Sequence, residues 1–194
     1  MYKYHQANNA EKAIEMGRNA LQFSADHPGA LVIVASLLAE LTRETDLDRD
    51  QRLAEATKDA HHALDTMDNW LATAPGVTDE QAQVFKPILA SRAHLALGMV
   101  EDLRKNPAEA EKHYRASVEL SSAQPDAFTF FRLAMALDAQ KKYAEALTAA
   151  NRAVELSATA GGQVADWAKQ EQARLAKLTG QTPPAPGPAP PPKS

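Results

Sequence analysis

The chain has 194 residues, of which 44% are hydrophobic, 24% charged and 6% aromatic, with a formal net charge of -4 and no cysteine. The lack of cysteine excludes disulfides and thiolate metal sites, and the mild charge gives no electrostatic case for binding nucleic acid or acidic membrane. The longest apolar run, at 30–39, is about half the roughly 20 residues that a membrane-spanning helix needs.

The opening of the chain is polar and lacks the hydrophobic core of a signal peptide. As written, the chain is therefore expected to be soluble and without a membrane-inserted segment, and its compartment is not assigned.

Apolar residues recur at three- and four-residue steps along the body of the chain, and no alternating strand pattern is present. Pro87 falls inside one of these segments, which predicts either a kinked helix or the meeting of two helices there. The patterns predict eight helices, at 8–25, 29–42, 49–73, 79–104, 107–121, 126–140, 143–158 and 162–179.

Helix start signals support several of these boundaries. Asn8 and Asn9 precede the first helix and the acidic run at 46–50 precedes the third. Thr78 and Gln81 have the spacing of a capping box before the fourth helix. Two prolines suit first-turn positions of later helices, Pro107 and Pro125.

The C-terminal segment has a different composition from the body. Seven of the 12 prolines lie in TPPAPGPAPPPKS at 182–194, which favours extended polyproline II with no core to join. We therefore divide the chain into a helical domain at 1–180 and a disordered proline-rich tail at 181–194. A flexible end or linker and a ligand for a proline-binding domain are both consistent with the tail.

Two stretches of the body are nearly the same. PAEAEKHYRASVEL begins at Pro107 and YAEALTAANRAVEL begins at Tyr143, 36 residues later. The shared positions are small or apolar, so the packing positions repeat while the surface varies. A helix pair that cannot bury its apolar face alone is stabilised by a neighbouring copy, which predicts a stack of helical hairpins.

These repeats resemble the tetratricopeptide repeat, a hairpin unit of about 34 residues. The resemblance covers 4–156 and is strongest after 90, and the arrangement is similar to bacterial multi-repeat proteins of this family. It implies an all-α, right-handed solenoid of helical hairpins, an α-α superhelix. The positions that match the family pattern are Leu97, Gly98, Ala110, Tyr114 and Ser117 in one repeat and Phe130, Leu133, Ala134, Ala146 and Ala153 in the next, with His94 a weaker match and Ala150 atypical.

The ends of the predicted repeat array differ. Tyr4 matches the last conserved aromatic of a first helix, which predicts that the chain starts in mid-repeat and belongs to a longer protein with a truncated N-terminus. At the other end, Trp167 and Leu175 lie on one stripe of the segment at 162–179, and Gly180 can end that helix in a left-handed conformation. This segment is predicted to be a capping helix.

The resemblance also implies a binding surface, because the first helix of each hairpin lines the concave groove in this family. The groove residues are then Arg92, Leu95, Met99, Asp102, Phe128, Phe131, Arg132, Met135 and Asp138. We expect an apolar peptide or amphipathic helix, oriented by the arginines, rather than a C-terminal carboxylate. The alternative is that Phe128 and Phe131 are core residues packed on the helix at 79–104 or on the cap.

The chemistry-bearing residues do not form a motif. Asp46, Asp48 and Asp50 alternate like the opening of an EF-hand loop, but Gln51 and Thr57 replace its glycine and glutamate. Their better interpretation is acidic stabilisation of a helix N-terminus. The adjacent histidines at 61–62 point to different faces of a helix and lack metal-ligand spacing. No catalytic, cofactor or metal site is predicted.

The function predicted from sequence is that of a scaffold or adaptor that binds a partner protein or peptide, without enzymatic activity. A structural spacer or self-association module of a larger protein is the alternative, and a metal-binding or catalytic helical domain is the third class. Only a scaffold or adaptor uses the exposed surfaces of the first helices to bind a partner, so these surfaces distinguish it from the other two classes.

Overall fold

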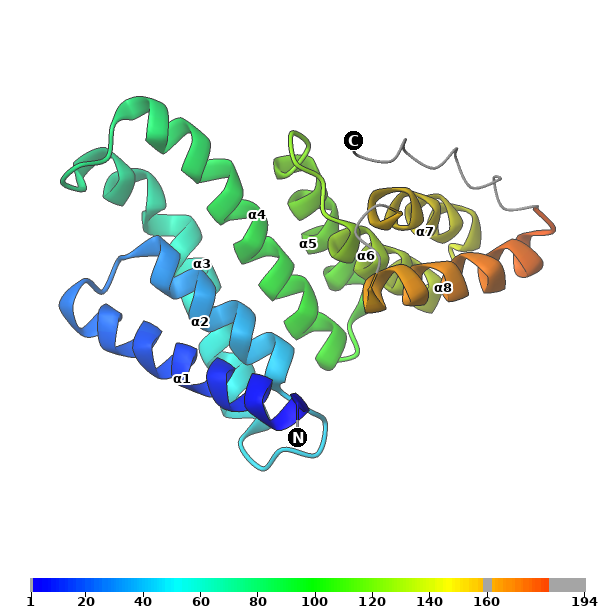
Figure 1. The fold of residues 1–194 in the computed structure, drawn as a ribbon, viewed down its shortest axis with the longest axis horizontal. Coiled ribbons are helices and arrows are strands. Elements are labelled where there is room, and N and C mark those ends of the chain that lie inside the picture. Colours follow the sequence, from blue (N-terminus) through cyan, green and yellow to red (C-terminus); the bar gives the residue numbers. More distant parts are fainter. Residues whose placement is uncertain (1, 159–161, 182–194) are drawn as a thin grey trace, which may run out of the picture. The chain divides into compact units, whose positions relative to one another are not determined.

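The computed structural model describes the backbone of residues 2–158 and 162–181, and side chains from Asn9 onward. All regular structure in these ranges is α-helical, which confirms the predicted all-α fold with eight helices (Figure 1). The helices are α1 (Tyr2–Phe23), α2 (Pro28–Leu41), α3 (Arg49–Thr73), α4 (Asp79–Leu103), α5 (Pro107–Leu120), α6 (Ala127–Ala139), α7 (Tyr143–Ser157) and α8 (Gln163–Thr179).

The chain divides into two compact units, unit 1 at 1–121 and unit 2 at 122–194. In unit 1, α2 packs on α1, α3 and α4, and α4 also packs on α3 and α5; Figure 1 shows α2 lying between α1 and α4. In unit 2, α7 packs on α6 and α8, and α6 also contacts α8. Within each unit, each helix thus packs on the next, which is consistent with a helical repeat.

Several helix ends are fixed as the sequence predicts. The Thr78 hydroxyl accepts the backbone N–H of Gln81 at 3.3 Å, and the Gln81 side chain accepts the backbone N–H of Thr78 at 3.0 Å. This capping box satisfies two N–H groups that have no partner within the helix. Pro107 is the first residue of α5, and Gly180 ends α8 with a φ of 68°.

Other boundaries differ from the predictions. Helix α1 begins at Tyr2, so Asn8 and Asn9 lie inside it; no proline or glycine in 2–7 stops the helix. Tyr4 therefore lies on the same helix as Ile14 and Gly17, and not on a separate helix that precedes them. Pro125 precedes α6, whose N-cap is Asp126.

Helix α4 is continuous across Pro87, which excludes the alternative of two helices meeting there. A proline inside a helix removes one backbone hydrogen bond. The buried residues of α4 begin at Ala90, and packing on α2, α3 and α5 stabilises the helix. No helix among the described residues has the length and hydrophobicity needed to cross a membrane.

The core of unit 1 depends on one pairing of a small residue with a large one. Tyr114 of α5 is fully buried, and its ring occupies the space where a side chain at Gly98 would lie. A Cβ atom built on Gly98 would be 2.4 Å from the ring. The small residue Gly98 and the bulky residue Tyr114 therefore interlock across α4 and α5. In unit 2 the corresponding positions are Ala134 and Ala150, both fully buried.

Candidate functional site

The predicted groove residues of unit 1 share one stripe of α4 but differ in exposure. Arg92 is exposed and Leu95 is half-buried, whereas Met99 is only 4% exposed. The carboxylate of Asp102 accepts a hydrogen bond from the hydroxyl of Tyr114 at 2.5 Å, so Asp102 holds α5 against α4. Arg92 and Leu95 therefore offer most of the surface that a partner could contact.

Two exposed apolar residues that the sequence interpretation missed continue this stripe toward the start of α4. Phe85 is 42% exposed and Ile88 is 38% exposed. Together with Arg92 and Leu95 they follow three- and four-residue steps, so they lie on one face of the helix. This three- and four-residue spacing could have identified both residues from the sequence. They extend the exposed face toward the start of α4.

In unit 2 the predicted residues of α6 form a surface together with α8. The ring of Phe131 stacks on the ring of Trp167, with centroids 5.9 Å apart and planes 23° apart. The guanidinium of Arg132 lies 5.2 Å from the centre of the Phe128 ring, which is a cation–π distance. Met135 is 40% exposed. We call these five residues the α6–α8 surface.

The contact between Phe131 and Trp167 bears on the choice between groove and core. Phe131 is half-buried and packs on α8. This contact is the one predicted if Phe131 is a core residue that packs on the capping helix. Trp167 nevertheless remains 39% exposed, so the stacked pair presents aromatic area to solvent. Phe131 thus contributes both to the packing of α8 and to the exposed surface.

Two contacts join α6 to α8 at the 36-residue interval that separates the two similar sequence stretches. Trp167 lies 36 residues after Phe131 and stacks on it. Arg174 lies 36 residues after Asp138, and its Nη2 is 2.6 Å from Asp138 Oδ2. These two contacts hold α8 against α6, so Trp167 and Arg174 join the candidate site.

A charged cluster anchors α8 next to this surface. The guanidinium of Arg174 donates two hydrogen bonds to Glu171, at 2.9 Å and 2.7 Å, in addition to its contact with Asp138. Glu171 is only 8% exposed. The hydrogen bonds that Arg174 donates to Glu171 and then to Asp138 raise the pKa of Arg174. Asp138 is therefore engaged by a cation of its own unit, and its main role is to hold α8 on α6.

A second polar cluster joins three helices of unit 1. The Nδ1 atoms of His94 on α4 and His113 on α5 lie 3.1 Å apart, so one ring donates a hydrogen bond to the other. Burial lowers the pKa of both histidines, and His61 of α3 lowers both further. The neighbouring His62 instead has its Nε2 2.7 Å from Asp26 Oδ1, so the two adjacent histidines have different partners.

Acidification is expected to weaken unit 1 through the His94 and His113 pair. The folded-state pKa of each lies below the unfolded value of 6.5. The unfolded chain therefore binds these protons first, so stability is lost as pH falls below about 6.5. Between pH 7.5 and pH 5.0, the free energy of unfolding measured in urea should fall more in the parent than in His113→Gln. The ionisable groups that face His113 and stay in both chains are His61, Glu101, Glu109 and Lys112.

Asp59 acts in the opposite sense. Burial, with a smaller contribution from Glu55, raises its pKa to about 6. The folded state therefore holds this proton more tightly than the unfolded chain, and the contribution grows as pH falls through about 6. Because Asp59 is present in both chains, its effect cancels in the comparison. Equal losses of stability in the parent and His113→Gln would contradict the prediction for the histidine pair.

The acidic run before α3 is used locally. Asp46 accepts the backbone N–H of Arg43 at 2.8 Å, and Asp50 lies in the first turn of α3, as expected for an acidic residue at a helix N-terminus. Within residues 2–158 and 162–181, no group of three or more histidine, aspartate or glutamate side chains is placed to hold a metal ion.

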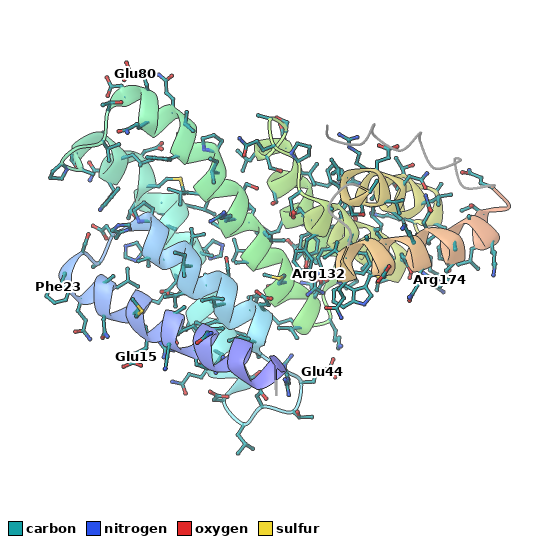
Figure 2. All side chains as sticks on the ribbon, viewed as in Figure 1. Glu15, Phe23, Glu44, Glu80, Arg132 and Arg174 are labelled. Carbon is teal, nitrogen blue, oxygen red and sulfur yellow. The ribbon has the colours of Figure 1, made fainter. Side chains whose placement is uncertain are left out.

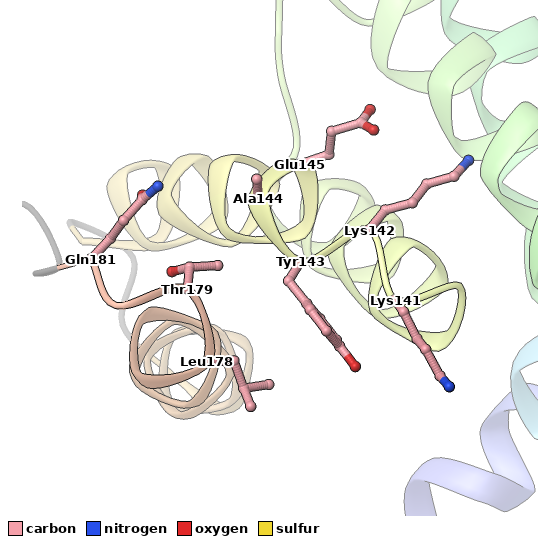
Figure 3. Close-up of a pocket in the computed structure, with 8 residues that line it drawn as sticks. All are labelled: Lys141, Lys142, Tyr143, Ala144, Glu145, Leu178, Thr179 and Gln181. Carbon is pink, nitrogen blue, oxygen red and sulfur yellow. The ribbon is translucent and has the colours of Figure 1, made fainter.

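An open hollow of about 500 Å³ lies at one end of unit 2, between the start of α7 and the end of α8 (Figure 3). Tyr143 and Thr179 contribute to its lining. Figure 3 shows the side chains of Lys141 and Lys142 extending away from Leu178. The polar groups do not converge on a point within the hollow, and we assign no chemistry to it.

No protein-family model matches the chain, and no curated protein matches it significantly.

Proposed function

We propose that this chain is a tetratricopeptide-type repeat protein that binds a protein or peptide segment on the exposed faces of its first helices. These faces lie on α4 in unit 1 and on α6 and α8 in unit 2. The observation that carries the proposal is the α6–α8 surface, where the stacked Phe131 and Trp167 rings lie beside the exposed Met135.

Two features support the repeat assignment. The ring of Tyr114 fills the space above Gly98, which places the small and bulky consensus positions against each other. The 36-residue interval recurs in the pairing of Phe131 with Trp167. This interval is close to the roughly 34-residue period of the family. We also propose that the helical hairpins stack into a right-handed solenoid.

The composition of the α6–α8 surface favours a peptide or helix with apolar side chains. Aromatic residues, methionine and arginine are enriched in protein interfaces, and methionine adapts to varied partner shapes. The stack of Phe131 on Trp167 and the anchoring of α8 by Arg174 form this surface before a partner arrives. Binding therefore needs little reorganisation, which lowers its entropic cost.

The guanidinium of Arg132, held over the Phe128 ring, gives one edge of the surface a positive charge. In the same way, the exposed Arg92 gives the α4 face a positive position beside Leu95. A partner with apolar residues at three- and four-residue spacing and an acidic flank fits these features. A spacer makes no use of either face, so the two functions differ in a measurable way.

The test uses peptides selected from a random 16-residue display library on the full-length chain. Their affinity is measured through Trp167 fluorescence in a Trp70→Phe background, since the chain has only two tryptophans. We expect Met135→Glu to weaken binding at least about tenfold, or roughly 1.4 kcal/mol, because it places a charge in the apolar contact.

The matched control is Thr148→Glu, which adds the same charge at an exposed position of α7. It should change the affinity less than about twofold, because the substitution lies outside the α6–α8 surface. Circular dichroism and melting of both variants establish that the fold is retained. If no peptide is enriched, or if both variants bind like the parent, the binding function is wrong and the spacer alternative gains support.

A further inference from the structure

Helix α1 is covered on two sides only. On the first side it packs on α2, where Ile14 is 1% exposed and a Cβ atom on Gly17 would lie 2.5 Å from the side chain of Val34. On the second side ion pairs join it to α3: Arg18 contacts Glu55 at 2.6 Å. The rest of its surface has no helix against it in unit 1.

The uncovered side carries an apolar stripe with charges at its ends. Met16 is 71% exposed and Phe23 is 92% exposed, the highest values for large apolar residues within any described helix (Figure 2). Exposed small residues lie between them. A lysine precedes Met16 and an aspartate follows Phe23 just past the helix end. We call this set the α1 outer stripe; it consists of Lys12, Met16, Asn19, Ala20, Phe23 and Asp26.

The outer stripe is complementary to itself when two copies run in opposite directions. If Met16 of one copy meets Phe23 of the other, then Asn19 meets Ala20, and small residues occupy the crossing. Small residues at a crossing let two helix axes approach to about 8 Å. Lys12 then comes within one residue of Asp26 of the other copy, whose side chain is 58% exposed. A parallel pair would instead place Lys12 against Lys12.

We propose that a second copy of this chain covers the α1 outer stripe, with the two α1 helices antiparallel about a two-fold axis near residues 19–20. The contact is isologous, because each copy supplies the same stripe and the large residue of one meets the large residue of the other. Opposite charges at the ends fix the antiparallel direction, since like charges would oppose the parallel one. This interface is separate from the α6–α8 surface and does not depend on the proposed binding function.

The first experiment measures the mass of the full-length chain by sedimentation equilibrium. We expect a concentration-dependent dimer for the parent and at least a tenfold higher dissociation constant for Phe23→Glu. The control is Leu47→Glu, which charges an exposed apolar residue in the turn before α3 and should dimerise like the parent. A parent that stays monomeric at about 100 µM, or equal effects of the two substitutions, would overturn the proposal.

The second experiment tests the direction of the helices by cysteine cross-linking, because the chain contains no cysteine of its own. In the antiparallel pair, Ala20→Cys lies beside its equivalent in the other copy. Lys12→Cys lies about 22 Å from its equivalent, from 1.5 Å of rise per residue, far beyond disulfide reach. Mild oxidation should therefore link Ala20→Cys into covalent dimers at least tenfold faster than Lys12→Cys.

Faster cross-linking of Lys12→Cys than of Ala20→Cys would indicate a parallel pair and contradict the proposed arrangement. Equal slow cross-linking of both, at the rate of an exposed control such as Lys58→Cys on α3, would mean that the stripe is covered by something other than a second copy. Only preferential linking through residue 20 supports the two-fold axis.

Discussion

Tyr114→Ala is expected to lower the free energy of unfolding of unit 1 by about 3 to 5 kcal/mol, the usual effect of removing a buried aromatic side chain. The Tyr114 side chain is fully buried, and its ring is the main packing partner of Gly98. The substitution also removes the hydrogen bond from the Tyr114 hydroxyl to Asp102. The half-buried carboxylate of Asp102 then loses the hydrogen bond that the buried Tyr114 hydroxyl donated to it.

The measurement can be confined to unit 1 because each unit contains one tryptophan. Trp70 of α3 lies in unit 1, where its indole N–H donates to Ser24 and its ring is 4.5 Å from that of His27. In a Trp167→Phe background, urea unfolding followed by fluorescence reports on unit 1 alone. The control Tyr143→Ala, at a half-buried position in the first turn of α7, should leave this transition unchanged.

Gly98→Ala provides a double-mutant cycle on the same contact. Alone, the added methyl group must displace the Tyr114 ring from 2.4 Å and should destabilise unit 1 by about 1 to 3 kcal/mol. In the Tyr114→Ala background the space is empty, and alanine should stabilise the helix by up to about 1 kcal/mol relative to glycine. Additive effects of the two substitutions would contradict the interlock.

Arg174→Gln is expected to destabilise unit 2 by about 2 to 3 kcal/mol. Removing one partner of a buried ion pair leaves an uncompensated charge and typically costs about 3 to 5 kcal/mol. The side chain of Glu171 is 9% exposed and that of Arg174 is 46% exposed, so solvent screening reduces the expected loss. The variant also leaves the carboxylates of Glu171 and Asp138 without the cation that lies between them.

Fluorescence of Trp167 in a Trp70→Phe background reports on this change directly, because Trp167 lies on α8 beside Phe131. The control is Arg152→Gln, which breaks an ion pair with Glu155 whose side chains are 47% and 57% exposed. Exposed pairs of this kind contribute about 0 to 1 kcal/mol. If Arg174→Gln and Arg152→Gln cost the same, then Arg174 does not anchor α8 in the way that the structure indicates.

Local signals in the sequence predicted the helices well because they act over a few residues. Thr78 with Gln81 and Gly180 fix the ends of α4 and α8 through hydrogen bonds and backbone angles that depend on neighbouring residues only. The start of α1 was harder to predict. Asn8 and Asn9 favour helix caps, but asparagine is also tolerated inside a helix, and the preceding residues do not interrupt α1.

The candidate site was predicted in part. Repeat spacing predicted Phe131 and Met135 as groove residues; Met135 is exposed, whereas Phe131 is half-buried against Trp167. The same reasoning did not show that Met99 is buried or that Arg174 engages Asp138. These outcomes depend on which side chains of other helices come near, and residues 36 positions apart have no local interaction that a pattern within one helix could reveal.

By itself, the sequence determined that this protein is helical, where most of its helices begin and end, and which positions repeat at a 36-residue interval. These properties follow from short-range periodicity, capping and proline placement. Only the tertiary structure decided that Trp167 completes the α6 surface, that His94 meets His113, and that one side of α1 is uncovered. The reason is physical: side-chain burial and charge pairing are set by distances between helices, which local propensity does not specify.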